Sequence, residues 1–394
     1  MTVTTFAAID IGSYEVCMKI FELSRKNGFR ELNHVRYRLE IGKGAYSSGR
    51  LEQGMVDAIC ERLKDFRNMM LEFGVTEYRA CSTSAFREMV NPVIILEQIY
   101  QRTGIRVEIL SNAEQHFLGY KSIAAIESGF KKIIQKGTAI LDVGGGGLQV
   151  SLFDKDTLVT TQSLKMGSMR IRERLKELEK ANTHYDQLIR EFIRNDLTAF
   201  QRLYLKDRDI KNVILMGDFL TDTIFREEIY DHIITMSEFT ARYEDTVYKT
   251  DQMLAAEMDI DPEYASLVVP TMVICKSFLD VFQAEAVWVP GVSLLDGIAY
   301  DFCEKKKYIT EIIAGLLEVS DRGARGILAG LVEKQMRFIL WKGKKDIPQK
   351  AALLGRKVKR ASREAVPFLF AYRGVRRHER QTFYTKFLEF ARFL

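Results

Sequence analysis

Short apolar runs interrupted by glycine turns mark two places in the first half of the chain. Residues 6–11 form one such run, Asp10-Ile11-Gly12 breaks it, and residues 16–23 are again apolar. The same order returns at residues 138–153, where an apolar run reaches Asp142 and meets four consecutive glycines, 144–147. Both patterns predict a strand, a tight turn and a second strand. The repetition indicates two similar lobes, each begun by a glycine-turn hairpin.

Apolar residues at helical spacing predict helices between and after these strands. The clearest case is residues 52–73, with apolar side chains at 55, 59, 63, 66 and 70. Further helices are expected at residues 93–103, 113–128 and 268–282, and further strands at 78–83, 106–110 and 213–218. From about residue 308 the pattern is helical, basic and rich in Phe. Strands that alternate with helices indicate the α/β class.

The length of 394 residues predicts more than one domain. We expect a first lobe at residues 1–128, a second lobe at 129–305 and a helical extension at 306–394. The five cysteines are scattered and form no CxxC pair, which is typical of buried thiols in a reducing compartment. With no signal-peptide or membrane-spanning pattern in the sequence, the expected location is the cytoplasm.

Charge is divided unevenly along the chain. Residues 331–394 carry a net charge of +12, whereas the rest of the chain carries −7. A basic segment on an acidic body favours an anionic partner, although a solvated helical face or a contact with the acidic body explains the charge equally well. Specific nucleic-acid recognition is disfavoured, because helical spacing makes most of the interleaved aromatic residues core positions.

The paired Asp-x-Gly turns have a chemistry in common. Glycines let a phosphate approach the backbone and expose successive N–H groups to an anion. Asp10 and Asp142 are candidate ligands for Mg²⁺ or another divalent cation, which would offset the charge of a polyphosphate. A lone Asp-x-Gly is a common turn, and the alternative for the tetraglycine is a β-bulge or a loose hairpin. The tetraglycine is the more specific signal, because four glycines cost backbone entropy without contributing packing.

Several segments within about residues 6–300 resemble the motifs of the Ppx/GppA family, the exopolyphosphatases and guanosine pentaphosphate phosphohydrolases. They are Ala8-Ile9-Asp10-Ile11-Gly12-Ser13, Thr83-Ser84-Ala85-Phe86-Arg87 with Asn91, Val107-Glu108-Ile109-Leu110-Ser111, Leu141-Asp142-Val143-Gly144-Gly145-Gly146, Leu164-Lys165-Met166-Gly167-Ser168, Met216-Gly217 and Leu294-Leu295-Asp296-Gly297. Their order and spacing agree with the family. The resemblance implies two actin-like (ribonuclease H-like) lobes with a cleft between them, followed here by a short helical C-terminal extension.

In that family the terminal phosphate of the substrate lies between the two glycine loops with a divalent metal ion. The resemblance therefore implies the following phosphate-binding residues: Gly12, Ser13, Arg87, Gly144, Gly145, Gly146 and Gly147. It also implies that Asp10 and Asp142 hold the metal, and that the substrate is inorganic polyphosphate or a guanosine polyphosphate such as pppGpp. Membrane binding is not expected, and a homodimer is in keeping with similar proteins.

This chain departs from the family at its two catalytic glutamates. The family segment S-G-x-E-E-A-R-L reads Ser111-Asn112-Ala113-Glu114-Gln115-His116-Phe117-Leu118, which leaves Glu114 but puts Gln115 at the catalytic position. The glutamate that ends D-I-G-G-G-S-T-E is Gln149. An amide does not accept a proton near neutral pH, and general-base help is typically worth about 10²–10⁴ in rate.

Two functions follow from these substitutions. One is a Mg²⁺-dependent hydrolase of terminal phosphoanhydrides in which Glu114, Glu15 or His116 replaces the missing base. The other is a catalytically impaired family member that binds polyphosphate or a guanosine nucleotide as a sensor or scaffold. For His116 the alternative is a helix-face histidine without a catalytic role. A kinase or a filament-forming relative of actin is the third reading, and the segments around Arg87 and Glu114 argue against it.

Overall fold

The computed structural model describes residues 4–24, 28–126, 136–155, 157–179, 184–206, 208–226 and 233–316. The chain divides into two compact units, residues 1–301 and 302–394, and the description below concerns the first. The basic segment at 331–394 lies outside the described residues. The predicted domain boundaries after residues 128 and 305 stay predictions.

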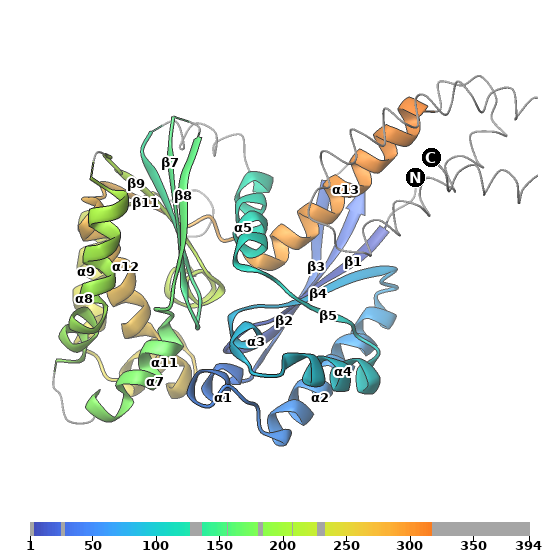
Figure 1. The fold of residues 1–394 in the computed structure, drawn as a ribbon, viewed down its shortest axis with the longest axis horizontal. Coiled ribbons are helices and arrows are strands. Elements are labelled where there is room, and N and C mark those ends of the chain that lie inside the picture. The colour runs from blue at the N-terminus through green and yellow to red at the C-terminus, as the bar shows by residue number, and fades with distance from the viewer. Residues whose placement is uncertain are drawn as a thin grey trace, which may run out of the picture. The chain divides into compact units, whose positions relative to one another are not determined.

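The first sheet has five strands in the order β3-β2-β1-β4-β5 (Figure 1). The strands are β1 Thr4–Ile11, β2 Glu15–Ser24, β3 Gly28–Arg38, β4 Glu77–Ser82 and β5 Val107–Ile109. Strands β1, β2 and β3 are joined as antiparallel hairpins, and β4 and β5 run parallel to β1. The central strand β1 is buried from residue 6 onward, as its near-continuous apolar run requires.

The second sheet has six strands in the order β10-β11-β9-β6-β7-β8. The strands are β6 Thr138–Val143, β7 Leu148–Asp154, β8 Thr157–Leu164, β9 Asn212–Met216, β10 Ile233–Thr235 and β11 Ala286–Trp288. Read from β8, the order β8-β7-β6-β9-β11 repeats the order of the first sheet, with the same strand directions. The internal repeat predicted from the two glycine turns is therefore confirmed, and so is the two-lobed α/β fold.

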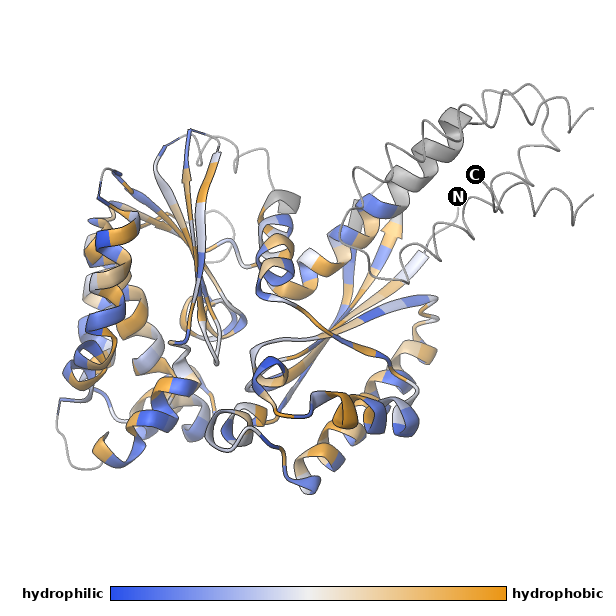
Figure 2. Ribbon diagram, viewed as in Figure 1, coloured by the Kyte–Doolittle hydropathy of each residue, from blue (hydrophilic) through white to orange (hydrophobic). Residues whose placement is uncertain are grey.

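Helices cover both sheets (Figure 1). Those before residue 130 are α1 Ile41–Ser47, α2 Gln53–Glu72, α3 Ser84–Glu88, α4 Pro92–Thr103 and α5 Asn112–Ile126. Those after it are α7 Ser168–Glu179, α8 Tyr185–Tyr204, the π-helix η1 Leu220–Ile224, α9 Met236–Val247, α10 Asp251–Met258, α11 Pro262–Ala265, α12 Val268–Phe282 and α13 Leu294–Leu316. Figure 2 shows α2 and α4 banded in hydrophobic and hydrophilic colours, as expected for amphipathic helices on a core.

The helix at α12 is the apolar centre of the second lobe. Nearly all of its residues are buried, Pro270 lies in its first turn, and its neighbours include the rings of Phe200 and Phe225. Within the described residues, 262–282 is one stretch long and apolar enough to cross a membrane, but most of it is buried inside this core. Such burial is typical of a core helix.

Most of the predicted elements are confirmed within a residue or two, including α2, α4, α12 and both glycine-turn hairpins. The helix expected from residue 308 is wrong in its start, because α13 already begins at Leu294. Strands β3 and β8 and helices α7 to α10 were not predicted. The helical pattern expected beyond residue 316 lies outside the described residues.

Candidate active site

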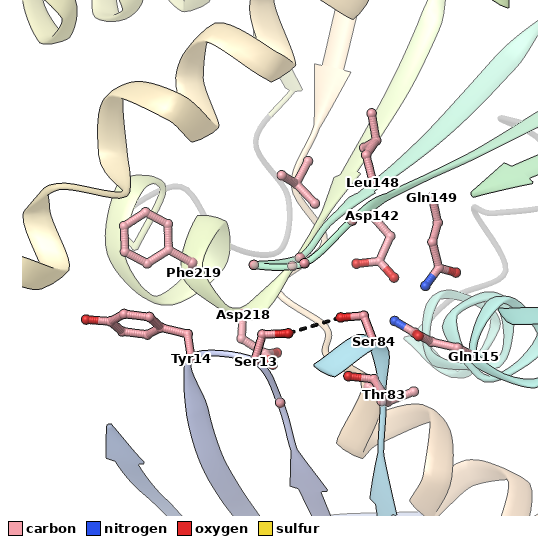
Figure 3. Close-up of a pocket in the computed structure, with 18 of the residues that line it drawn as sticks. Ser13, Tyr14, Thr83, Ser84, Gln115, Asp142, Leu148, Gln149, Asp218 and Phe219 are labelled. Carbon is pink, nitrogen blue, oxygen red and sulfur yellow. Dashed lines mark hydrogen bonds between the residues drawn. The ribbon is translucent and has the colours of Figure 1, made fainter. Parts of the chain in front are cut away.

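A cavity of about 340 Å³ lies between the two sheets, and both glycine turns open onto it (Figure 3). Every residue predicted to bind phosphate or metal lines it: Asp10, Gly12, Ser13, Arg87, Asp142, Gly144, Gly145, Gly146 and Gly147. Gln115 and Gln149 line it as well, whereas Glu114 does not. The fold thus brings together residues from segments more than 130 positions apart.

The first glycine turn joins β1 to β2 and is closed by its own backbone. The N–H of Gly12 donates to the carbonyl of Glu15 at 2.9 Å. The Ser13 hydroxyl forms hydrogen bonds with the Tyr46 hydroxyl and, at 3.0 Å, with Ser84 Oγ (Figure 3). Tyr46 and Ser84 are themselves 2.9 Å apart, so the three hydroxyl groups form a closed cluster that fixes Ser13 at the cavity wall.

The tetraglycine turn joins β6 to β7 and is held by α7. The carbonyls of Gly144 and Gly145 accept from backbone N–H groups at the start of that helix, at 3.2 and 3.0 Å. The carbonyl of Gly146 accepts from Arg170 Nε at 2.7 Å. The N–H groups of residues 145–147 make no hydrogen bond to the described part of the chain. Unpaired successive N–H groups form the kind of nest that binds anions.

Gly146 is the point at which the tetraglycine turn meets helices α1 and α3 of the first lobe. A Cβ on this residue would lie 1.7 Å from the Tyr46 hydroxyl and 2.4 Å from Ser84 Oγ, so no larger residue fits without a shift. Arg170 reinforces the contact, because it donates to Glu88 at 2.6 Å and lies 4.0 Å over the Tyr46 ring. The tetraglycine turn can therefore approach the first lobe this closely only because Gly146 has no side chain.

Asp10 and Asp142 occupy equivalent positions at the ends of β1 and β6. Burial, with the nearby charges of Glu15 and Asp142, raises the pKa of Asp10 to about 7. Burial raises the pKa of Asp142 to about 6. The Oδ1 atom of Asp10 is buried without a hydrogen-bond partner in the described part of the chain. Two desolvated carboxylates with an unsatisfied oxygen suit a hard divalent cation, so these residues fit the predicted Mg²⁺.

No cluster of three or more His, Cys, Asp or Glu side chains at metal-binding distances occurs among the described residues. This agrees with the usual binding mode of Mg²⁺, which takes one or two carboxylates together with substrate phosphates and water. The fit of Asp10 and Asp142 therefore concerns a cation shared with a bound phosphate.

Gln115 contacts the predicted phosphate-binding arginine. Its Oε1 accepts two hydrogen bonds from the Arg87 guanidinium, both at 3.1 Å, and Arg87 also donates to the carbonyl of Leu110 at 2.7 Å. A glutamate here would neutralise Arg87, whereas the amide leaves its full positive charge for a ligand. The Gln115 amide nitrogen remains a donor, which again suits an anion.

Gln149 belongs to a row of side chains across the second sheet. It is the direct cross-strand partner of Asp142 on β6 and of Ser163 on β8. Its Oε1 is buried without a partner in the described part of the chain, and Figure 3 shows the side chain next to Asp142. A glutamate at position 149 would therefore place a second negative charge next to Asp142, and Gln149 avoids this.

Glu114 has a structural role at the start of α5. Its Oε2 accepts from the N–H and the hydroxyl of Ser111, at 2.9 and 2.7 Å, and its own N–H donates to Ser111 Oγ at 3.2 Å. This reciprocal pattern is a capping box. As a replacement base, Glu114 has no access to the cavity in this arrangement.

Glu15 lines the cavity, but Arg36 binds its carboxylate. The three contacts from Arg36 nitrogens measure 2.7, 2.8 and 3.0 Å. Such a charge-assisted pair occupies the oxygens that a base would use. His116 does not line the cavity and is buried behind its wall.

Sequence reasoning missed four residues of the site: Tyr46, Ser163, Arg170 and Asp218. Asp218 lines the cavity, and burial together with Glu15 raises its pKa well above the ordinary value. A signal for it existed, since it follows Gly217 at the end of a predicted strand, as Asp142 precedes a glycine at another. Tyr46 and Ser163 carry no local motif and are found only through the fold.

The fold is that of an actin-like α/β protein with two lobes, and its cavity lies between two glycine turns. A family model described as the Ppx/GppA phosphatase family matches residues 21–306. The chain belongs to the Ppx/GppA phosphatase family. An exopolyphosphatase structure from Cytophaga hutchinsonii has a TM-score of 0.67 at 19% identity, and the match covers 77% of this chain and 98% of that one.

Two curated relatives show the range of the family. Exopolyphosphatase 1 of Mycobacterium leprae is 25% identical over 166 residues, which is 41% of this chain and 47% of that protein. The guanosine-5'-triphosphate,3'-diphosphate pyrophosphatase of Vibrio atlanticus is 20% identical over 306 residues, 76% of this chain and 59% of that protein. The chain thus spans about half the length of these relatives.

Proposed function

We propose that this protein is a divalent-cation-dependent phosphatase that hydrolyses the terminal phosphoanhydride of inorganic polyphosphate or of pppGpp. The observation that carries the proposal is the pair of glycine turns that face one cavity, with the free N–H groups of residues 145–147 and the uncompensated charge of Arg87. The family, and relatives named for both substrates, support it.

The charges that line the cavity explain why a cation is needed. Glu15 and Glu88 are paired with Arg36 and Arg170, whereas Asp10 and Asp142 form no ion pair with the described part of the chain. In their ionised forms these two carboxylates would repel a phosphate chain in a desolvated site. A divalent cation held by Asp10 and Asp142 would neutralise the bound phosphate and polarise its phosphoryl oxygen.

Different groups of the protein would then bind different parts of the phosphate chain. Backbone N–H groups of the tetraglycine turn bind the phosphoryl oxygens, and the fork of Arg87 binds a phosphate of the chain. The amide of Gln115 donates a further hydrogen bond, and the Ser13 hydroxyl would donate another on leaving its cluster with Tyr46 and Ser84. These groups orient the terminal phosphate and leave one role open, the acceptance of a proton from water.

A second function, binding without turnover, is favoured by the two glutamines. With amides at 115 and 149, the cavity carries two fewer negative charges than the family pattern, which strengthens anion binding and weakens hydrolysis. The chain would then act as a sensor or scaffold for polyphosphate or a guanosine nucleotide.

Phosphate release separates these functions. It is measured with Mg²⁺ from long-chain polyphosphate and from pppGpp, for the natural chain and for the double variant Gln115→Glu plus Gln149→Glu. The matched control is Gln201→Glu, a charge change on an exposed position of α8. Release by the natural chain that disappears on removal of Mg²⁺ supports the hydrolase.

Release confined to the double variant, or polyphosphate binding without release in either chain, would leave the binding function in place of the hydrolase. If the natural chain neither binds nor cleaves these compounds, both functions are overturned.

A further inference from the structure

His116 connects two hydroxyl groups of β8 to the helix that carries Gln115. The side chain is buried, with 6% of its surface exposed. Its Nε2 lies 3.0 Å from Ser163 Oγ, and its Nδ1 lies 2.9 Å from Thr161 Oγ1. Ser163 lines the cavity, whereas His116 stands behind it. A hydroxyl at the cavity wall is therefore backed directly by an imidazole.

The hydrogen bonds around Thr161 determine which imidazole nitrogen carries the proton. The hydroxyls of Tyr120, Ser151 and Thr161 are mutually bonded at 2.6, 2.8 and 3.0 Å, and Thr161 also bonds His116 Nδ1. These four hydrogen bonds need four hydrogens, and the three hydroxyls supply three. The fourth comes from Nδ1, so Nε2 is the free acceptor and Ser163 donates to it.

The position of Ser163 suits an attack on a phosphate held at Asp142. Asp142, Gln149 and Ser163 are successive cross-strand partners on β6, β7 and β8. Neighbouring strands lie about 4.8 Å apart, so roughly 10 Å separates the first and third positions. That distance accommodates a phosphoryl group near Asp142 with a water molecule between it and Ser163. Gln149 and Gln115 border the same space, where the family places its glutamates.

We propose that Ser163, backed by His116, is the general base that Gln115 and Gln149 cannot provide. This rests on the proposed hydrolase function. The water oxygen forms a bond to the terminal phosphorus, and the bridging phosphorus–oxygen bond breaks, its electron pair leaving with the shortened chain. The water proton passes to Ser163 Oγ as the Ser163 proton passes to His116 Nε2. The imidazolium later returns its proton through Ser163 to solvent.

The buried imidazole is a base of the right strength for this role. Burial and the positive charge of Arg87 lower the pKa of His116 to about 4. The ring is therefore unprotonated at neutral pH and is about as basic as the glutamate carboxylate, of pKa about 4.3, that the family uses. Arg87 is the charged group that acts on this ring.

The test measures kcat and KM for phosphate release by the full chain with Mg²⁺ and polyphosphate. Ser163→Ala is expected to lower kcat by about 10²–10⁴ and to change KM by less than about threefold. His116→Asn is expected to give a similar loss. Thr160→Ala is the matched control, because it removes a hydroxyl from the opposite face of the same strand.

Rescue distinguishes a base from a structural group. Adding Gln115→Glu to Ser163→Ala is expected to recover most of kcat, since it places a carboxylate in the same space. If the natural chain is active but Ser163→Ala keeps its kcat, the base assignment is overturned and the hydrolase stands. If Ser163→Ala is inactive and the rescue fails although polyphosphate still binds, the assignment is likewise overturned. A natural chain without activity overturns both.

Discussion

The side chain of Asp10 shows how a single buried carboxylate links the fold to its ligand. Its Oδ1 has no hydrogen-bond partner in the described part of the chain, and its pKa is raised to about 7. The folded protein therefore binds a proton that the unfolded chain, with a pKa near 3.8, releases at lower pH. Stability must fall as the pH rises between these two values, because the folded state binds more protons over that range.

A divalent cation should reverse this loss. Without Mg²⁺, we expect the Tm of the natural chain to fall by a few degrees relative to that of Asp10→Asn between pH 5.5 and pH 7.5, and Mg²⁺ to restore it by binding the ionised form. Asp10→Asn should remove the part of the fall that Asp10 causes and the response to Mg²⁺, whereas the raised pKa values of Asp142 and Asp218 leave a smaller fall in both chains. Thermal denaturation of both chains, with and without Mg²⁺, checks this. His116 is neutral in the folded protein but has its ordinary pKa of 6.5 in the unfolded chain, so its contribution to stability rises with pH over this range. That contribution is the same in both chains and cancels when they are compared. An Asp10→Asn chain that Mg²⁺ still stabilises fully would place the cation elsewhere.

Among single residues, the sequence predicts those whose role is visible from the few residues around them. A short segment is enough to find Asp10, Asp142 and the tetraglycine, because each lies in or next to a glycine turn. Ser163 and Tyr46 have no such context, because their importance comes from neighbours on other strands and helices. Glu114 shows the opposite error, since a residue of catalytic type near the site serves as a helix cap.

Among the elements, the tetraglycine hairpin depends most on a precise fit. Gly146→Ala places a methyl group against Tyr46 and Ser84, and the turn must move away from the first lobe. We expect phosphate binding to weaken by about tenfold or more, since a shift of about 1 Å at such a site is costly. Isothermal titration with polyphosphate and Mg²⁺ measures it. Gly54→Ala, on α2 with no atom near the added Cβ, is the control. Equal affinity in both variants would mean that the close approach of this turn to the first lobe is not needed for binding.

The two longest strands that sequence reasoning missed share a physical cause. Strands β3 and β8 lie at sheet edges, and their partly exposed residues give no continuous apolar run. The central strands β1 and β6 are buried on both faces and read clearly. The row Asp142, Gln149 and Ser163 needs the register of three strands, which no single segment specifies.

Across the whole unit, ion pairs join separate elements around the cavity. Asp301 at the end of the first unit binds Lys121 of α5 at 2.7 Å and Arg79 of β4 at 3.4 Å. On the other side, Arg36 of β3 binds Glu15 and also reaches Asp222 in η1 and, at 2.9 Å, the hydroxyl of Tyr264. These ion pairs add to the apolar cluster of Tyr14, Met169 and Leu267, which also joins the two lobes.

Arg36→Met tests the contribution of these ion pairs. It leaves Glu15, Asp222 and the nearby Asp218 without their cation, and we expect a loss of about 2–3 kcal/mol, less than for a fully buried pair because Arg36 is 24% exposed. Burial and Glu15 raise the pKa of Asp218 and Arg36 lowers it, so removing Arg36 raises that pKa further and the loss should grow from pH 5 to pH 8. Urea denaturation at both pH values measures it. Arg102→Met, which breaks an exposed pair with Asp57 within one lobe, should cost far less at either pH, because solvent screens that pair. Equal losses for the two variants would show that the lobes are held by packing alone.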